Sequence, residues 1–449
     1  MSTSRRTVAF LVLSLTGGVV FQVAYIRFVY LGDTARALDI SIQEYGNVTS
    51  VFGAVAVVMY FVGGWFADRF SPKRLIVVAL VGTGAVDLYL ATVPGVAGIV
   101  VAHVLFAVFG MGLYWSALVK SIGMLGSPDQ QGRLFGFLEG TRGLASTVVG
   151  FVGSAVVAAA VVASDGVLTL MRLFGVLCFV FAVLVAVLVR QDEAERQAAA
   201  RQTVTLGELL SAARNRYTWL IGGTIMAMYC FYTLLGYLTP LLQNGFGVAA
   251  AAVGVIGVIR TYVFQFVAGP VGGILADKAT RSTPRYIRLM FVVAGAAALA
   301  FLLLPHRPAL IGVAFAITIV LCFAVFSARG VYWATVGEVG VPAVQRGGVI
   351  GLASGLAYLP DAFLPSVGAW WVGDPANGVA EQGGGFTALF AFLIGAAVVG
   401  FVLTTLTLRQ SRRPGTLPSA STASTASTTE RPSWTSATSP STSSRSTGA

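Results

Sequence analysis

The fold is decided by the stretch Gly63-Gly64-Trp65-Phe66-Ala67-Asp68-Arg69-Phe70-Ser71-Pro72-Lys73-Arg74. Apolar runs enter and leave it, over 51–62 and 75–93. Because roughly 20 apolar residues cross a bilayer as a helix, each run belongs to a membrane span. Lys and Arg resist translocation, so this short, positive turn is expected on the cytoplasmic side. Glycines at a helix end let two helices approach closely, and an aspartate beside them can accept from a neighbouring helix N-terminus.

Two internal repeats indicate that the chain is duplicated. A weaker copy of the first stretch occurs later as Gly272-Gly273-Ile274-Leu275-Ala276-Asp277-Lys278. Independently, the run Gly-Leu-Tyr-Trp-Ser-Ala-Leu-Val-Lys at 112–120 matches Gly-Val-Tyr-Trp-Ala-Thr-Val-Gly-Glu at 330–338. Repeats at equivalent places in two halves predict six spans followed by six more.

Composition excludes an ordinary soluble protein. Hydrophobic residues make up 56% of the chain and charged residues 10%, with a mean hydropathy of +0.82. The net charge of +11 lies in loops between spans, which favours cytoplasmic retention of those loops over nucleic acid as a partner. Cys178, Cys230 and Cys322 fall inside apolar runs without metal-ligand spacing and are expected to be core residues. With no phosphate-binding loop and no nucleophile elbow, neither an enzyme nor a cofactor is expected.

The apolar periods predict twelve spans, near 7–31, 46–67, 74–93, 96–120, 133–161, 167–189, 217–241, 248–276, 286–304, 309–337, 346–372 and 384–408. Lys and Arg concentrate on one side of this scheme, which places both termini in the cytoplasm. The predicted organisation is an N-terminal six-helix bundle (1–190), a cytoplasmic linker (191–216), a C-terminal six-helix bundle (217–410) and a disordered Ser/Thr-rich tail (411–449).

The loop between the second and third spans resembles the signature loop of the major facilitator superfamily in Gly64, Asp68, Arg69, Lys73 and Arg74. It departs from that pattern at Ser71 and Pro72, where the family has Gly and then Arg, and the second copy keeps only Gly273, Asp277 and Lys278. The resemblance implies an all-α membrane protein with twelve transmembrane helices in two pseudo-symmetric six-helix bundles around one solute pathway.

Three arginines within spans are candidates for binding an anionic solute. A buried charge in a span faces a cavity or a partner. Arg27 either reaches the outer interface or binds substrate, while Arg260 and Arg329 either bind substrate or form structural ion pairs. The run 21–28 resembles the first helix of the organophosphate:phosphate antiporters, whose arginine binds the substrate phosphate. That family's second arginine, in span seven, has no counterpart in the run 229–233.

Acids within spans are fewer. Asp361, flanked by Pro360 and Pro365, is either a proton-coupling carboxylate or a permanent partner of Arg329 or Arg260. Glu139 is a second candidate proton carrier, with the alternative that it simply pairs with Arg142 on the same helical face. Asp87 has no partner evident from sequence.

Aromatic and loop residues complete the candidate site. By resemblance to the superfamily, four aromatics lie on pathway-lining spans, with core packing as the alternative: Tyr114, Trp115, Tyr332 and Trp333. Lys120 and Glu338 occupy matched positions, as an inter-bundle latch or as solvated helix ends. They join the signature-loop residues and Asp277 as candidate gating residues. The motifs at 138–143, 328–334 and 360–363 are similar to a bacterial subgroup of uncharacterised members, some of which lie with sulfo-sugar catabolism.

These observations predict a monomeric secondary active transporter in the cell (inner) membrane. Because cations outnumber acids within the spans, we expect a small organic anion as substrate: a sugar phosphate, sulfonate or carboxylate, coupled to protons or a counter-anion. The alternative is proton-coupled uptake or efflux of a neutral or cationic compound such as a sugar or drug, centred on Asp361. A non-transporting membrane sensor would need a signalling appendage, for which the tail is a poor candidate.

Overall fold

The computed structural model describes residues 3–125, 131–189, 211–341, 343–374 and 380–411, all of which belong to one compact unit. Within these residues, nine helices are long and apolar enough to cross a membrane. Segments 3–37, 42–69 and 72–90 supply the remaining three crossings of the twelve-helix fold. The predicted tail and most of the predicted linker lie outside the described residues.

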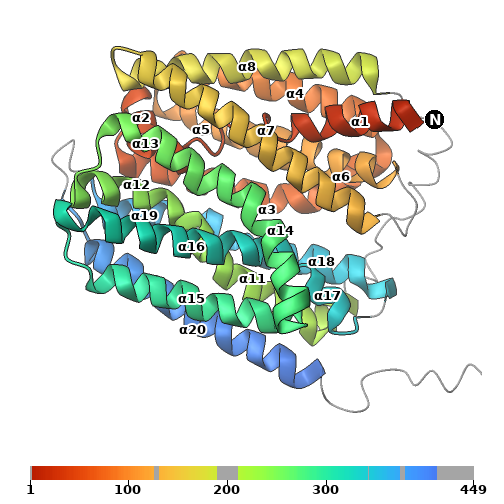
Figure 1. The fold of residues 1–449 in the computed structure, drawn as a ribbon. Coiled ribbons are helices and arrows are strands. Elements are labelled where there is room, and N and C mark those ends of the chain that lie inside the picture. Colours follow the sequence, from red (N-terminus) through yellow and green to blue (C-terminus); the bar gives the residue numbers. More distant parts are fainter. Residues whose placement is uncertain (1–2, 126–130, 190–210, 342, 375–379, 412–449) are drawn as a thin grey trace, which may run out of the picture. The chain divides into compact units, whose positions relative to one another are not determined.

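The N-terminal half of the chain has six crossings, several of them built from more than one helix (Figure 1). They are α1 (Thr3–Thr16) with α2 (Arg27–Ala37), α3 (Ile42–Arg69), α4 (Pro72–Leu90), α5 (Gly95–Phe106) with π-helical η1 (Ala107–Trp115) and α6 (Ser116–Gly123), α7 (Gln131–Ala159) and α8 (Ala163–Leu188). Helices α4 and α8 pack backbone to backbone, since a Cβ on Gly84 would lie 2.7 Å from the Gly175 carbonyl oxygen.

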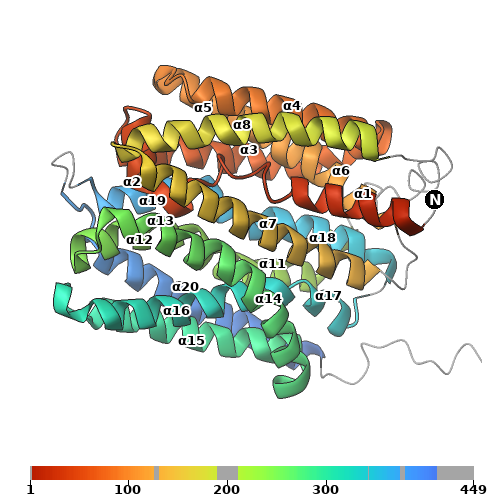
Figure 2. The ribbon, with the colours of Figure 1, turned by 45° about the horizontal axis from the view of Figure 1, so that its top comes forward.

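The C-terminal half of the chain is built in the same way, with several crossings made of more than one helix (Figure 2). Its crossings are α11 (Arg216–Leu234) with α12 (Leu238–Pro240), α13 (Ala250–Val258) with π-helical η5 (Ile259–Val263) and α14 (Phe264–Leu275), α15 (Thr283–Leu303), α16 (Ile311–Val331) with α17 (Ala334–Glu338), α18 (Ala343–Ala357) with α19 (Leu364–Val372), and α20 (Gly385–Ser411). The span that contains α11 is the central one, since 94% of its apolar window is buried inside the protein, against 33% for α20.

The first crossing is interrupted between α1 and α2. Residues 17–26 form consecutive turns because Gly17 and Gly18 press against α7, where a Cβ on Gly18 would lie 2.5 Å from the Cβ of Ala145. Side chains replace the missing helical bonds, and the Gly18 carbonyl accepts from Gln22 Nε2 (2.7 Å) and Ser146 Oγ (3.3 Å). The interruption places Arg27 at the start of α2.

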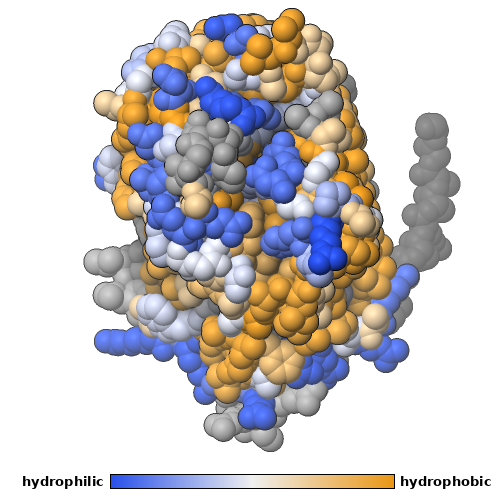
Figure 3. Space-filling view, turned by 90° about the vertical axis from the view of Figure 1, so that its left-hand side faces the viewer, coloured by the Kyte–Doolittle hydropathy of each residue, from blue (hydrophilic) through white to orange (hydrophobic). Residues whose placement is uncertain are grey.

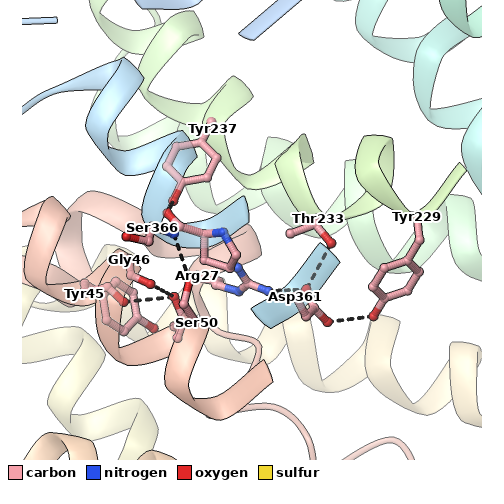
Figure 4. A network of polar contacts seen from close by, with 11 residues as sticks. Arg27, Tyr45, Gly46, Ser50, Tyr229, Thr233, Tyr237, Asp361 and Ser366 are labelled. Carbon is pink, nitrogen blue, oxygen red and sulfur yellow. Dashed lines mark hydrogen bonds and ion pairs between the residues drawn. The ribbon is translucent and has the colours of Figure 1, made fainter. Parts of the chain in front are cut away.

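The eleventh crossing breaks where the prolines predict. A single 3₁₀ turn, η8 (Leu359–Ala362), separates α18 from α19. Pro360 cannot donate a backbone hydrogen bond, so the helix cannot continue through it. The break turns the backbone of Asp361 toward α3, and the carboxylate itself toward α11 (Figure 4).

The signature loop is short because α3 runs on to Arg69 and α4 begins at Pro72. Proline suits the first helical position, so this departure from the family pattern starts α4 cleanly. The Arg69 guanidinium lies 4.1 Å from the Trp65 ring centroid, and Lys73 Nζ donates to the Ala186 carbonyl at 2.7 Å. The side chain of Asp68 lies outside the described part of the structure.

A reciprocal capping box begins α3 at its other end. Ser41 Oγ accepts from the Glu44 backbone N–H at 3.1 Å, and Glu44 Oε2 accepts from the Ser41 N–H at 2.8 Å. We expect Ser41→Ala to lower the free energy of unfolding by about 1 kcal/mol. The Glu44 N–H would lose its acceptor, and the Glu44 side chain would no longer be held in place to accept from the Ser41 N–H. Thermal unfolding of purified protein checks this, with Ser41→Thr as the control that keeps the cap. Equal destabilisation by both substitutions would contradict it.

Candidate functional site

A buried ion pair between Arg27 of α2 and Asp361 of η8 joins the two halves (Figure 4). Arg27 Nη2 lies 3.1 Å from Asp361 Oδ1, and both side chains are almost fully enclosed, at 4% and 7% exposed. Two residues of α11 complete the carboxylate's shell: Tyr229 donates to Oδ2 at 2.8 Å and Thr233 to Oδ1 at 2.9 Å. Three donors satisfy the oxygens of this buried carboxylate, which lies between α2 and α11.

The partner of Asp361 is therefore Arg27, not Arg260 or Arg329 as the sequence had suggested. Arg27 does not reach outward to an interface, because its guanidinium is turned inward onto the carboxylate. It also lies 4.8 Å from the ring centroid of Phe28, the next residue of α2.

Arg329, near the end of α16, has no carboxylate within ion-pair distance among the described residues. Its guanidinium carbon lies 3.7 Å from the Tyr232 ring centroid and 5.8 Å from the rings of Tyr229 and Phe326. Its Nη1 is buried without a hydrogen-bond partner in the described structure. Aromatic faces stabilise this cation partly and leave a donor available.

Arg260 is buried deeper, at 2% exposed, on the π-helical stretch η5. Its Nη2 donates to the carbonyl of Phe28, while Nε and Nη1 have no partner within the part of the chain that the structure covers. The Phe28 ring in turn contacts Tyr232 at 4.9 Å between centroids. The three predicted arginines therefore gather around one aromatic pair, Phe28 and Tyr232.

Half-buried tyrosines that sequence reasoning missed surround this cluster. Tyr60 of α3 stacks on Tyr358 at 5.2 Å, and Tyr358 meets Tyr229 at 5.0 Å. Tyr25, in the broken first crossing, stacks on Phe28 at 5.8 Å. Their hydroxyls and ring faces suit a polar solute. Two of these tyrosines carried a signal in the sequence, since Tyr25 lies in the run 21–28 around Arg27 and Tyr358 precedes the Pro360–Asp361 break.

The predicted aromatics occupy different environments. Tyr114 is fully buried within the N-terminal half and its hydroxyl lies 2.7 Å from Thr16 Oγ1. Trp115 is half-buried, with the Arg142 guanidinium 5.1 Å from its ring centroid. Tyr332, 5% exposed, meets Trp333 edge-on at 5.4 Å.

The sequence-based alternative that Glu139 pairs with Arg142 is confirmed. Glu139 Oε1 lies 3.0 Å from Arg142 Nη1, with Glu139 52% and Arg142 15% exposed. This pair neutralises the cation beside Trp115. Asp87 lies elsewhere, enclosed between α4 and α8, where its Oδ2 faces the Cys178 sulfur at 3.9 Å.

The candidate gating residues Lys120 and Glu338 each contact their own half. Lys120 Nζ donates to the Ala67 carbonyl at 3.0 Å, and Glu338 Oε2 accepts from the Thr283 N–H at the start of α15, at 2.6 Å. Arg74 and Asp277 are exposed.

The two halves pack closely where α3 meets α19 and η8. A Cβ on Gly46 would lie 2.6 Å from the Cβ of Ala369, and one on Gly53 would clash with the Asp361 carbonyl oxygen. A second close contact joins α7 and α14, since a Cβ on Gly143 would lie 3.1 Å from the Phe266 Cα. Figure 3 shows hydrophilic side chains among apolar ones on the face of the molecule that lies to the left in Figure 1.

A family model described as "Major Facilitator Superfamily" matches residues 10–365. The chain is 27% identical to "Inner membrane protein YqcE" of Escherichia coli (strain K12), over 93% of this chain and 98% of that one. It is 28% identical to "Inner membrane protein YihN" of the same organism, over 82% and 88%. Among solved structures it resembles a bacterial homologue of the human lysosomal transporter Spinster, inward-facing and unoccupied, with a TM-score of 0.73, 16% identity, and coverage of 92% and 100%.

Proposed function

The chain belongs to the Major Facilitator Superfamily of membrane transporters, and on this premise we propose that it moves a small organic anion across the inner membrane by alternating access. Its full-length relatives are inner membrane proteins, and a transporter of this family is not an enzyme. The charges at the centre of the molecule indicate the class of substrate.

The observation that carries the proposal is that the guanidinium of Arg329 has no carboxylate partner among the described residues. Arg27 is neutralised by Asp361 and Arg142 by Glu139, whereas Arg329 and Arg260 meet no described carboxylate. Of these two, Arg329 lies on the Tyr232 face with a donor to spare. Arginine keeps its proton even when buried, so its charge must be met by an anion. A planar guanidinium suits carboxylate, phosphate or sulfonate through two parallel bonds.

Tyrosines around Arg329 support a solute with a polar body, as in a sugar phosphate, sulfonate or sugar acid. The rings of Tyr60 and Tyr358 stack on each other beside Tyr229, so faces and hydroxyls from both halves meet there. The resemblance of the first crossing to the organophosphate antiporters supports the same class, with Arg329 in place of the arginine that span seven lacks.

Coupling is assigned to Asp361. A proton on this carboxylate removes the charge that holds Arg27, so the contact that Arg27 and Asp361 make between the halves weakens. The signature loop, Lys120, Asp277 and Glu338 form the cytoplasmic gate, and both termini lie on the same side. A counter-anion that competes for Arg27 would act on the same pair.

A second candidate is proton-coupled transport of a neutral or cationic compound. The supporting observation is that Asp361 lies between hydroxyls of Tyr229 and Thr233, a setting in which a carboxylate can bind a cation or a polyol. In that case Arg329 and its aromatic contacts are structural.

Uptake into sealed proteoliposomes tests the proposal. A panel of labelled sugar phosphates, sulfonates and carboxylates is compared with neutral sugars and organic cations, with and without a pH gradient. We expect at least one anion to be transported and Arg329→Gln to reduce its kcat/KM by about tenfold to a hundredfold, the worth of charge-assisted bonds.

Arg307→Gln is the matched control, because it removes the same charge from an exposed loop residue and should transport normally. Transport of a cation or neutral compound that is indifferent to Arg329→Gln, with no anion moved, would refute the proposal.

A further inference from the structure

The central cluster carries more positive charge than one anionic group can balance. Arg27, Arg260 and Arg329 surround Phe28 and Tyr232, and Asp361 is the one carboxylate that contacts the described members of this cluster. The described side chains therefore have a net charge of two positive units. We propose that the transported species is a dianion, and that Arg260 is the residue that makes the site select two negative charges over one.

This inference deepens the proposed function and rests on it. It adds a charge state to the substrate class and a role for a residue outside the Arg27–Asp361 pair. The chemical classes it favours are phosphate monoesters and dicarboxylates. Sulfonates and monocarboxylates, which carry one charge, are disfavoured.

Arg260 cannot be a neutral structural residue. A buried lysine can lose its proton, whereas arginine stays charged in proteins. Its one hydrogen bond is to a backbone carbonyl, which carries only a partial charge, and its Nε and Nη1 have no acceptor in the described structure. A buried full charge with two idle donors is strongly unfavourable unless an anion lies near it.

The contact with Phe28 links Arg260 to the substrate region. The Phe28 carbonyl accepts a hydrogen bond from Arg260, and the Phe28 ring contacts the ring of Tyr232. The Arg329 guanidinium lies over that same Tyr232 ring. Arg27 belongs to the same turn of α2 as Phe28. In this low-dielectric interior charges act over several ångströms without contact, so a second negative charge on a ligand at Arg329 is stabilised by Arg260.

A matched pair of small anions tests charge selection without assuming the organic part of the substrate. The pair is sulfate and methanesulfonate, and both ions have a tetrahedral sulfur. Methanesulfonate has a methyl group in place of one of the four oxygens of sulfate, so sulfate is a dianion and methanesulfonate a monoanion. Saturable thermal stabilisation of the purified, full-length protein is measured for each, at constant ionic strength set with sodium chloride. We expect sulfate to have an apparent Kd at least about tenfold below that of methanesulfonate.

Two substitutions then test whether Arg260 causes the preference for sulfate over methanesulfonate. Arg260→Gln should bring the ratio of the two Kd values close to one while anion binding persists, and Arg307→Gln, at an exposed loop residue, should leave the ratio as in the parent. Equal affinity for the two anions in the parent, no stabilisation by sulfate, or an unchanged ratio in Arg260→Gln each overturns the dianion inference. The proteoliposome panel separates this from the proposed function: monoanion uptake that needs Arg329 refutes the dianion inference alone, and no anion uptake refutes both.

Discussion

Asp361→Asn is expected to lower the free energy of unfolding by about 3–5 kcal/mol and to remove the dependence of uptake on a pH gradient. The substitution keeps the side chain's shape but leaves Arg27, 4% exposed, as a buried cation without its counter-charge. It also weakens the hydrogen bonds that the Tyr229 and Thr233 hydroxyls donate to this side chain, because a neutral amide is a weaker acceptor than a carboxylate. An amide does not exchange a proton as access alternates, so coupling is lost for a separate reason.

A double-mutant cycle separates these two effects. Arg27→Gln combined with Asp361→Asn removes the stranded charge, so thermal unfolding should recover most of the lost stability while gradient dependence stays absent. Asp165→Asn, at an exposed position in the first turn of α8, is the matched control and should behave as the parent. If Asp361→Asn has the melting temperature of the parent and its uptake still depends on the pH gradient, the ion pair neither stabilises the protein nor couples transport to protons.

Gly53→Ala is expected to reduce transport at least about tenfold, although alanine normally stabilises a helix by about 1 kcal/mol over glycine. The added Cβ would lie 2.0 Å from the Asp361 carbonyl oxygen and 2.2 Å from its carbon. These are backbone atoms, which no rotamer change can move aside. Helix α3 and η8 must separate, so their close packing between the two halves is lost.

Gly351→Ala provides the control for this prediction, because a Cβ there meets nothing within 4 Å. It should gain the helix propensity of alanine and retain uptake. Initial uptake rates and melting temperatures of both variants, measured beside the parent, test the prediction for Gly53→Ala. Full activity in Gly53→Ala would mean that the close approach of α3 to η8 is not needed for the transport cycle.

Local signals in the sequence predicted the crossings and the break in the eleventh, whereas the interruption of the first crossing over residues 17–26 was not predicted. Apolar length predicts a span, and Pro360 predicts the interruption that η8 shows, because both effects act over one or two helical turns. The cost of a charge in a span likewise pointed to Arg27, Arg260, Arg329 and Asp361.

The pairing of those charges was not predictable. Arg27 and Asp361 are 334 residues apart, and which arginine meets the carboxylate depends on how the halves pack. Tyr25 and Tyr60 were missed for a related reason. An aromatic residue in an apolar span satisfies the same hydropathy pattern whether its ring faces lipid, the core or a solute.

The enclosure of the span that contains α11 has a consequence for how substrate preference can change. A helix beside lipid can take a larger or smaller side chain because the acyl chains rearrange around it. With 94% of its apolar window inside protein, this span has close-packed neighbours from both halves instead. A change in side-chain volume at Tyr229 or Tyr232 therefore alters the packing against neighbouring helices that must move during each transport cycle. Selectivity and turnover will change together when this helix is altered, so variants with a new preference should first be slower ones.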